Sequence, residues 1–281
     1  MSKIIWDQEG QRFYETGVDR GVLYPKVSGA YPKGVAWNGL TSVEEAPTGG
    51  EASAIWADNI KYLNLISNED FGCTINAYTY PDEFEECDGT KSAANGLLQI
   101  TAQTRKVFGF CYRTLIGNDS EGTDYGYEIH IVYGCTAAPS SKTRSTVNDS
   151  PEAAELSWTV STTPEVIKAT DSEGKPFKPT AHIKLESANF KTEAQKAKLT
   201  ALENLLYGTD GTVTYTEFSG STFEDGVTYY ERSGVEGAYV YTPTTDTEPD
   251  QGKTYYTKSE TGGTDAYLPL PDAIITLLTA A

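Results

Sequence analysis

Alternation of apolar and polar residues between Ile75 and Leu185 is the feature that most restricts the fold of this 281-residue chain. In YEIHIVYG (127–134) every second side chain is apolar, and related patterns occur in VFGFCYRTLI (107–116), ELSWTV (155–160) and HIKLES (182–187). A period of two is typical of strands with one face in the core. The pattern predicts a mainly β chain, an antiparallel sandwich or barrel, with His130 and His182 on outward polar faces.

Two segments have helical character. In TEAQKAKLTALENLLYG, Thr192 and Gln195 have the spacing of a capping box, and Gly208 suits the end of a helix. We therefore predict a flanking α-helix at about 192–207. A second helix is predicted from Ala54 to Leu65, inside a large turn-rich loop.

A repeat of 26 residues marks an insertion at 211–266, where the composition becomes rich in Thr, Gly and Tyr. EDGVTYYER in the first copy corresponds to DQGKTYYTK in the second. Two strand-turn-strand units, each with glycine at its turn, would explain the 26-residue spacing. The repeat residues are Tyr215, Gly226, Tyr229, Tyr230, Tyr241, Gly252, Tyr255 and Tyr256. Ten acidic and three basic side chains indicate a solvated, outward-facing appendage to a domain formed by 1–210 and 267–281.

The formal net charge of −18 argues against a nucleic-acid-gripping role, because such affinity comes largely from Lys and Arg. An acidic surface is instead suited to letting DNA pass without holding it. The start of the chain, MSKIIWDQEGQRF, lacks the apolar run of a signal peptide, and no segment approaches a membrane span. We therefore expect folding in a cytoplasm and no membrane insertion.

Motifs for catalysis or cofactors are absent from the sequence: it has no G-x-S-x-G, Walker or G-x-G-x-x-G pattern. The two histidines are expected to have no catalytic or metal role. Cys73, Cys87, Cys111 and Cys135 form no C-x-x-C pair, so they are predicted to be buried, reduced thiols rather than zinc ligands. We expect no enzymatic activity, no metal and no cofactor, although distant carboxylates could still form a hydrolase pair.

The segment YPDEFEECDG (80–89) concentrates acidic residues. It lacks the register of a calcium loop, and in an extended conformation its carboxylates would point to both sides rather than converge. A solvated loop or an interface is the favoured interpretation. We expect Pro81 and Phe84 to fix the chain, while the acids pair with a neighbouring subunit or line a lumen.

Several long stretches together carry a family resemblance. They include YPKGVAWNGLTSVEEAPTGGEAS, WADNIKYLNL, AYTYPDEFEECDG, FGFCYRTLIGNDSEGTDYGYEIHIVYG, STVNDSPEAAELSWTVSTTP and LPLPD. The chain resembles the major tail proteins, or tail-tube proteins, of long-tailed bacteriophages over most of 12–210 and again at 267–278. The repeat insertion departs from shorter members of that family.

The resemblance implies a β-sandwich subunit that assembles into hexameric rings stacked as a hollow tube in the virion. DNA would pass through the lumen without specific binding during ejection into the host. The implied partners are further copies of the chain, a tape-measure protein, and tail terminator and distal tail proteins. Within such rings, inner strands of neighbouring subunits would continue one sheet.

Ring contacts are predicted in segment 35–70 and in the acidic segment. The candidate interface residues are Trp37, Leu40, Ile55, Trp56, Tyr62, Tyr80, Pro81, Asp82, Glu83, Phe84, Glu85 and Glu86. An alternative is that the apolar residues of 35–70 only cover the sandwich core. An alternative function is a cell-wall or carbohydrate-binding adhesin, acting through exposed aromatic residues of the 211–266 repeats.

Overall fold

The computed structural model describes residues 3–146, 149, 153–235, 239–250 and 252–280, and its contacts divide the chain into two compact units. The body comprises Met1–Tyr207 and Asp265–Ala281. The insert comprises Gly208–Thr264, where the sequence places the insertion at 211–266. The fold is mainly β, as predicted.

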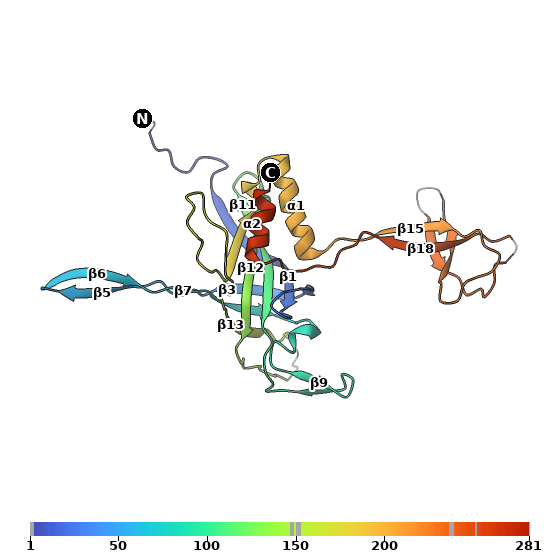
Figure 1. The fold of residues 1–281 in the computed structure, drawn as a ribbon, viewed down its shortest axis with the longest axis horizontal. Coiled ribbons are helices and arrows are strands. Elements are labelled where there is room, and N and C mark those ends of the chain that lie inside the picture. The colour runs from blue at the N-terminus through green and yellow to red at the C-terminus, as the bar shows by residue number, and fades with distance from the viewer. Residues whose placement is uncertain (1–2, 147–148, 150–152, 236–238, 251, 281) are drawn as a thin grey trace. The chain divides into compact units, whose positions relative to one another are not determined.

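Antiparallel strands form the main sheet of the body, in the order β2-β1-β11-β12-β13-β8-β3, and β14 also pairs with β12 (Figure 1). Their bounds are β1 Phe13–Pro25, β2 Val35–Trp37, β3 Leu40–Glu45, β8 Gly72–Ala77, β11 Phe108–Asn118, β12 Gly122–Ala137, β13 Leu156–Ser161 and β14 His182–Glu186. The four alternating stretches of the sequence are thus confirmed as strands. Among the described strands the path does not close, so the barrel alternative is wrong.

Strand β12 belongs to two layers because it changes partner along its length. Its residues Glu128–Val132 pair with β14, whereas Thr136 and Ala137 pair with β13. Between them the register against β11 shifts by one residue, and Gly134 lies there with a φ of +60°. A Cβ on Gly134 would come within 2.1 Å of the Thr163 carbonyl oxygen, so only glycine fits. The bulge carries β12 from a large layer (β2, β1, β11, β12, β14) into a small layer (β13, β8, β3).

Two cores cover opposite faces of the large layer. The first lies between the large and small layers, where Phe108 and Phe110 pack with Ile75 and Trp158. The second lies between the large layer and two helices, α1 (Glu193–Tyr207) and α2 (Pro271–Thr279). Leucines of α1 and Ile274 of α2 belong to this second core. The result is a sandwich with a helical layer on one side.

Helix α1 confirms the predicted capping box. The Gln195 N–H donates to Thr192 Oγ1 over 3.2 Å, and the Thr192 N–H donates to Gln195 Oε1 over 3.0 Å. Gly208 follows the helix with a φ of +77°, as expected for its end. Helix α2 was not predicted, although Asp272, Thr276 and Thr279 have the spacing of a narrow polar helical face and Pro271 suits its first turn.

The predicted outward position of the histidines is wrong. His130 is buried, with a side chain 2 % exposed, and the His182 side chain is 12 % exposed. The two-residue alternation of the sequence correctly assigns the side chains of β12 and β14 to the two faces of the sheet. Around His130 and His182, however, both faces of the large layer are covered, whereas Lys184 on the same face of β14 is 48 % exposed.

The predicted helix from Ala54 to Leu65 is also wrong, because the segment forms a hairpin of β5 (Ala52–Ala57) and β6 (Ile60–Ile66). Its two turn residues, Asp58 and Asn59, both have positive φ, at 49° and 64°. That conformation suits the right-handed twist of a tight hairpin. The remaining short elements of the body are β4 Thr48–Gly49, β7 Glu69–Asp70, β9 Lys91–Ala93, β10 Leu98–Ile100, η1 Asp82–Phe84 and η2 Ser187–Asn189.

The insert is a four-stranded antiparallel sheet in the order β15-β18-β16-β17. Its strands are β15 Thr212–Glu217, β16 Tyr229–Ser233, β17 Val240–Pro243 and β18 Tyr255–Thr261. The 26-residue repeat is visible in its hydrogen bonds. The Glu224 N–H donates to the Tyr229 hydroxyl over 3.0 Å, and the Asp250 N–H donates to the Tyr255 hydroxyl over 3.2 Å. The two units interlock, since the first strand of each pairs with the second strand of the other.

The four cysteines are free and buried, which confirms the prediction of buried thiols. Burial raises the pKa of Cys73, Cys87 and Cys111 to about 12, so these thiols remain protonated at neutral pH. In the described part of the chain, no helix has both the length and the apolar character needed to cross a membrane.

Candidate functional site

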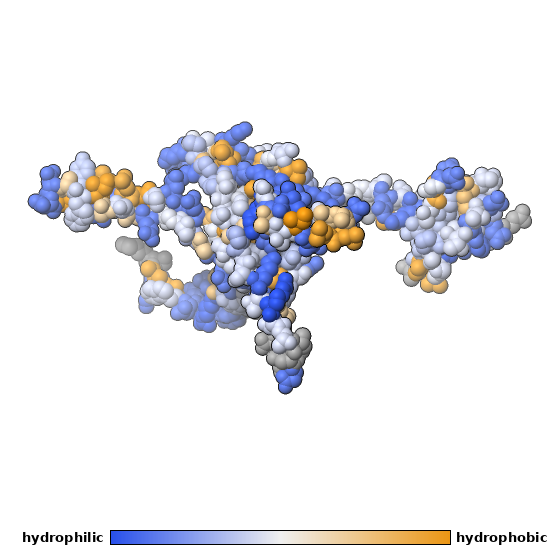
Figure 2. Space-filling view, turned by 90° about the horizontal axis from the view of Figure 1, so that it is seen from below, coloured by the Kyte–Doolittle hydropathy of each residue, from blue (hydrophilic) through white to orange (hydrophobic). Residues whose placement is uncertain are grey.

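The β5–β6 hairpin, here called the arm, exposes an unusual number of large apolar side chains. Trp56 is 67 % exposed, Tyr62 66 % and Ile55 40 %. The sequence had singled out these three, and the arm adds Ile60, Leu63, Leu65 and Ile66. Figure 2 shows apolar residues gathered on the arm, at the left of the view. The Asp58–Asn59 pair between two apolar runs was the sequence signal for this hairpin.

An exposed apolar hairpin needs a surface to pack against. Two isolated strands are at best marginally stable in water, and large contiguous apolar patches on soluble proteins mark interaction sites. Cross-strand pairing puts Ile55 opposite Leu63, so their side chains share one face of the arm. The arm therefore has the chemistry of an interface and buries none of these side chains within the described body.

Trp37 and Leu40, the other two apolar candidates from segment 35–70, are not on the arm. Trp37 is 2 % exposed and belongs to the first core, and its indole N–H donates to the Thr79 carbonyl over 2.9 Å. Leu40 is half-buried and packs against the same core. For these two residues the alternative interpretation holds, since they cover the sandwich core.

The acidic segment is anchored rather than extended. Its residues Asp82–Phe84 form the short helix η1, so the alternation of an extended strand does not decide where its carboxylates point. Phe84 is fully buried, and its ring lies 4.5 Å from that of Trp37 and 5.1 Å from that of Trp158. Tyr80 and Pro81 are half-buried. Phe84 therefore fixes this segment to the first core, as expected.

The acids of this segment divide into paired and free groups. Glu86 pairs with Lys106 at 2.9 Å, and Glu85 accepts a hydrogen bond from Gln99. Asp82 and Glu83 are exposed and take part in no ion pair between described residues. Asp88, the fifth acid of the segment, pairs with Arg105 and Lys142, and the other four border one groove of about 530 Å³. Two exposed carboxylates thus remain for contact with another molecule.

The tyrosines of the insert lie on both faces of its sheet. Tyr229 and Tyr255 contact the ring of Phe223 on one face. On the other face, the rings of Tyr215 and Tyr241 stack with centroids 3.7 Å apart, and Tyr230 and Tyr256 pack at their edges. Gly226 and Gly252 have positive φ in the two equivalent turns. The repeat aromatics therefore pack largely on one another.

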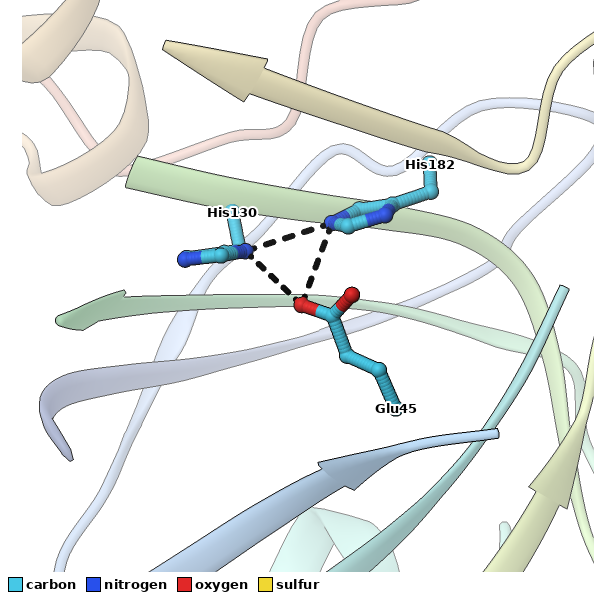
Figure 3. A group of neighbouring side chains, drawn as sticks. All are labelled: Glu45, His130 and His182. Atoms are coloured by element: carbon cyan, nitrogen blue, oxygen red, sulfur yellow. Dashed lines mark hydrogen bonds and ion pairs between the residues drawn. The ribbon is translucent and has the colours of Figure 1, made fainter. Parts of the chain in front are cut away.

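A cluster of Glu45, His130 and His182 is a feature that the sequence did not predict (Figure 3). The three residues come from β3, β12 and β14, which are distant in the sequence, so no linear motif could indicate them. Burial lowers the pKa of His130, and it lowers the pKa of His182 to about 4. Both rings are therefore neutral at neutral pH. A neutral imidazole offers a nitrogen lone pair and is the form of histidine that binds metals.

No protein-family model matches the chain, and a comparison with curated proteins gives no significant match.

Proposed function

We propose that the protein is a structural subunit of a phage tail tube, which assembles as hexameric rings stacked into a hollow conduit for DNA. The observation that carries the proposal is the apolar arm, in a chain whose sequence resembles tail-tube proteins. Seven large apolar side chains are exposed on it. A second copy of the chain is the occupant that a self-assembling tube supplies.

The negative charge of the chain is consistent with a tube whose lumen lets DNA pass without binding it. The formal net charge is −18, and exposed carboxylates repel phosphate. The exposed Asp82 and Glu83 are candidates for the lumen or for a contact with the next ring. In either position they need no chemistry beyond their charge.

The edge strands of the body sheet are candidate contacts between neighbouring subunits of a ring. The outermost strands of the body sheet are β2 and β3, and β14 pairs with β12 outside this strand order. Unpaired edges invite pairing with another chain, and closure of a ring removes such edges. In this proposal neighbouring subunits continue the body sheet around the ring, while the arm reaches an adjacent subunit.

Negative-stain microscopy of the purified chain tests the proposal. The wild type should form rings or hollow tubes, and Trp56→Ser should abolish them while the circular dichroism of the folded body is retained. Trp6→Ser is a matched control, because Trp6 is also exposed, at 72 %, but lies outside the arm.

Two results would count against the proposal. A wild type that stays monomeric at high concentration contradicts self-assembly itself. Tubes formed by Trp56→Ser as readily as by Trp6→Ser contradict the role of the arm and leave the sheet edges as the remaining contact.

A further inference from the structure

Three potential ligand atoms converge where the two sheet layers meet (Figure 3). His130 Nδ1 lies 3.1 Å from Glu45 Oε1 and 3.3 Å from His182 Nε2, and His182 Nε2 lies 3.9 Å from Glu45 Oε1. Zinc binds nitrogen and oxygen at about 2.0–2.2 Å in a tetrahedron, which separates ligand atoms by roughly 3.3–3.6 Å. The spacing of the three atoms is therefore close to that of a metal site.

The hydrogen bonds around His130 fix its tautomer. Thr114 has one hydroxyl hydrogen, and it donates that hydrogen to Glu15 Oε1 over 2.6 Å. Thr114 Oγ1 also lies 3.1 Å from His130 Nε2, so Nε2 must be the donor of that contact. Neutral His130 consequently presents a lone pair at Nδ1. A histidine whose second ring nitrogen donates to a hydroxyl–carboxylate chain has the outer support common among metal ligands.

The Nδ1 lone pair faces other lone pairs. Glu45 Oε1 already accepts a hydrogen bond from the Tyr112 hydroxyl over 2.8 Å, and it has no hydrogen to give. A hydrogen on His182 Nε2 can serve only one of the two acceptors. Two acceptor atoms 3.1 Å apart without a shared hydrogen repel each other, and burial makes the repulsion costly. A cation between the three atoms satisfies all of them.

The site is held from several sides and is reachable. The His130 ring stacks on Tyr112, and the His182 ring packs on Phe71 with centroids 4.3 Å apart. His182 also borders a groove of about 870 Å³. The two imidazoles are thus fixed by neighbouring rings, and the Glu45 side chain, which is 34 % exposed, opens the cluster to solvent.

We propose that Glu45, His130 and His182 bind a divalent transition-metal ion of the zinc class, with water in the fourth position. Two imidazoles and one carboxylate favour zinc or cobalt over magnesium or calcium, which prefer sites built of oxygen. The ion joins the small layer, through Glu45 of β3, to β12 and β14 of the large layer.

The position of the site gives the ion a structural task. Glu45 is the last residue of β3, and Phe71, which packs on His182, precedes β8. These two residues flank the segment that carries the arm. The bound ion therefore fixes the two chain ends from which the arm departs.

Calorimetric titration of the purified full-length chain, stripped with a chelator, tests the proposal with Zn²⁺ as the probe. One ion should bind per chain, and Zn²⁺ should raise the thermal unfolding temperature. His182→Gln and Glu45→Gln should each weaken binding at least tenfold. Glu44→Gln is the matched control, because Glu44 is exposed on the same strand and should leave binding unchanged. Co²⁺ should give the visible absorption of a tetrahedral site.

The outcomes separate a metal site from a hydrogen-bonded cluster. Zn²⁺ binding that is the same in wild type, Glu45→Gln and His182→Gln would overturn the proposal, as would Mg²⁺ binding of equal strength. If His182→Gln does not fold, Glu45→Gln alone tests the proposal, because the Glu45 side chain is 34 % exposed and tolerates replacement. None of these readouts depends on tube formation, so the metal site and the proposed function can fail independently.

Discussion

Replacing Phe84 by alanine should destabilise the body by about 3–5 kcal/mol. The ring is fully buried, and its centroid lies within 5.5 Å of those of Trp37, Phe108 and Trp158, which come from both sheet layers. Truncation removes roughly 100 Å² of buried apolar surface, worth about 2.5 kcal/mol at 25 cal/mol per Å². A cavity term adds to this, because large rings held from two layers cannot collapse into the space.

Urea unfolding followed by tryptophan fluorescence measures this effect on unassembled protein. All four tryptophans, Trp6, Trp37, Trp56 and Trp158, lie in the body, so the insert does not contribute to the signal. With a slope of about 1–3 kcal/mol per M, the midpoint should fall by at least about 1 M.

Glu83→Gln is the control for this variant, because the neighbouring exposed residue should change stability by less than about 0.5 kcal/mol. A Phe84→Ala variant within 1 kcal/mol of the wild type would refute the reasoning. It would mean that the acidic segment is a detachable surface loop and that the first core does not depend on its anchor.

Three further perturbations have defined outcomes. Deleting 211–266 with a short join should leave tubes intact by microscopy, since the Tyr267 N–H bonds to the Leu205 carbonyl over 2.8 Å and the body's ends are therefore adjacent. Charge reversal at Glu83 and Glu85 should block ring stacking while the monomer remains folded. Asp19→Asn should cost at most about 1 kcal/mol at pH 7, because Asp19 is 43 % exposed. The hydrogen bond from Arg113 lowers the Asp19 pKa, so its stabilisation is present above about pH 4 and is lost as pH falls further.

Each of these outcomes has a contrary result. Loss of assembly on deletion of 211–266 would contradict the insert as a dispensable appendage. Charge reversal at the exposed Glu173 is the control for the acidic segment, and unchanged tubes in both variants would make that segment a plain solvated loop. A difference between Asp19→Asn and wild type that is as large at pH 3 as at pH 7 would contradict the charge argument.

The sequence predicts best where one element's own residues decide the structure. Helix α1 carries its cap and its terminal glycine within 17 residues, and both are confirmed. The residues of the arm do not decide its structure in this way, since Ile55, Trp56, Ile60 and Leu63 also fit the spacing of a helix. The Asp58–Asn59 pair, whose backbone has positive φ, decides between helix and hairpin, and the spacing of the apolar residues alone does not reveal it.

The histidines illustrate a different limit. Alternation correctly assigns His130 to the face opposite Ile129 and Ile131, but it cannot tell what covers that face. The small layer covers it, through β3 and Glu45, and this arrangement depends on the change of partner at Gly134 in β12. A cluster assembled from three strands in two layers is therefore a property of the tertiary fold.

The energetics of the arm argue that assembly should be cooperative. Complete burial of an apolar side chain is worth about 1.5–3 kcal/mol, so half-burial of the seven exposed ones gives roughly 5–10 kcal/mol. Association costs about 4–15 kcal/mol in lost freedom, so one arm in one contact leaves an isolated pair weak. In a closed ring every subunit both gives and receives contacts, and stacking adds more for the same loss of freedom. The proposed arrangement therefore favours tubes over dimers, and sedimentation should show monomers and large assemblies with few species between.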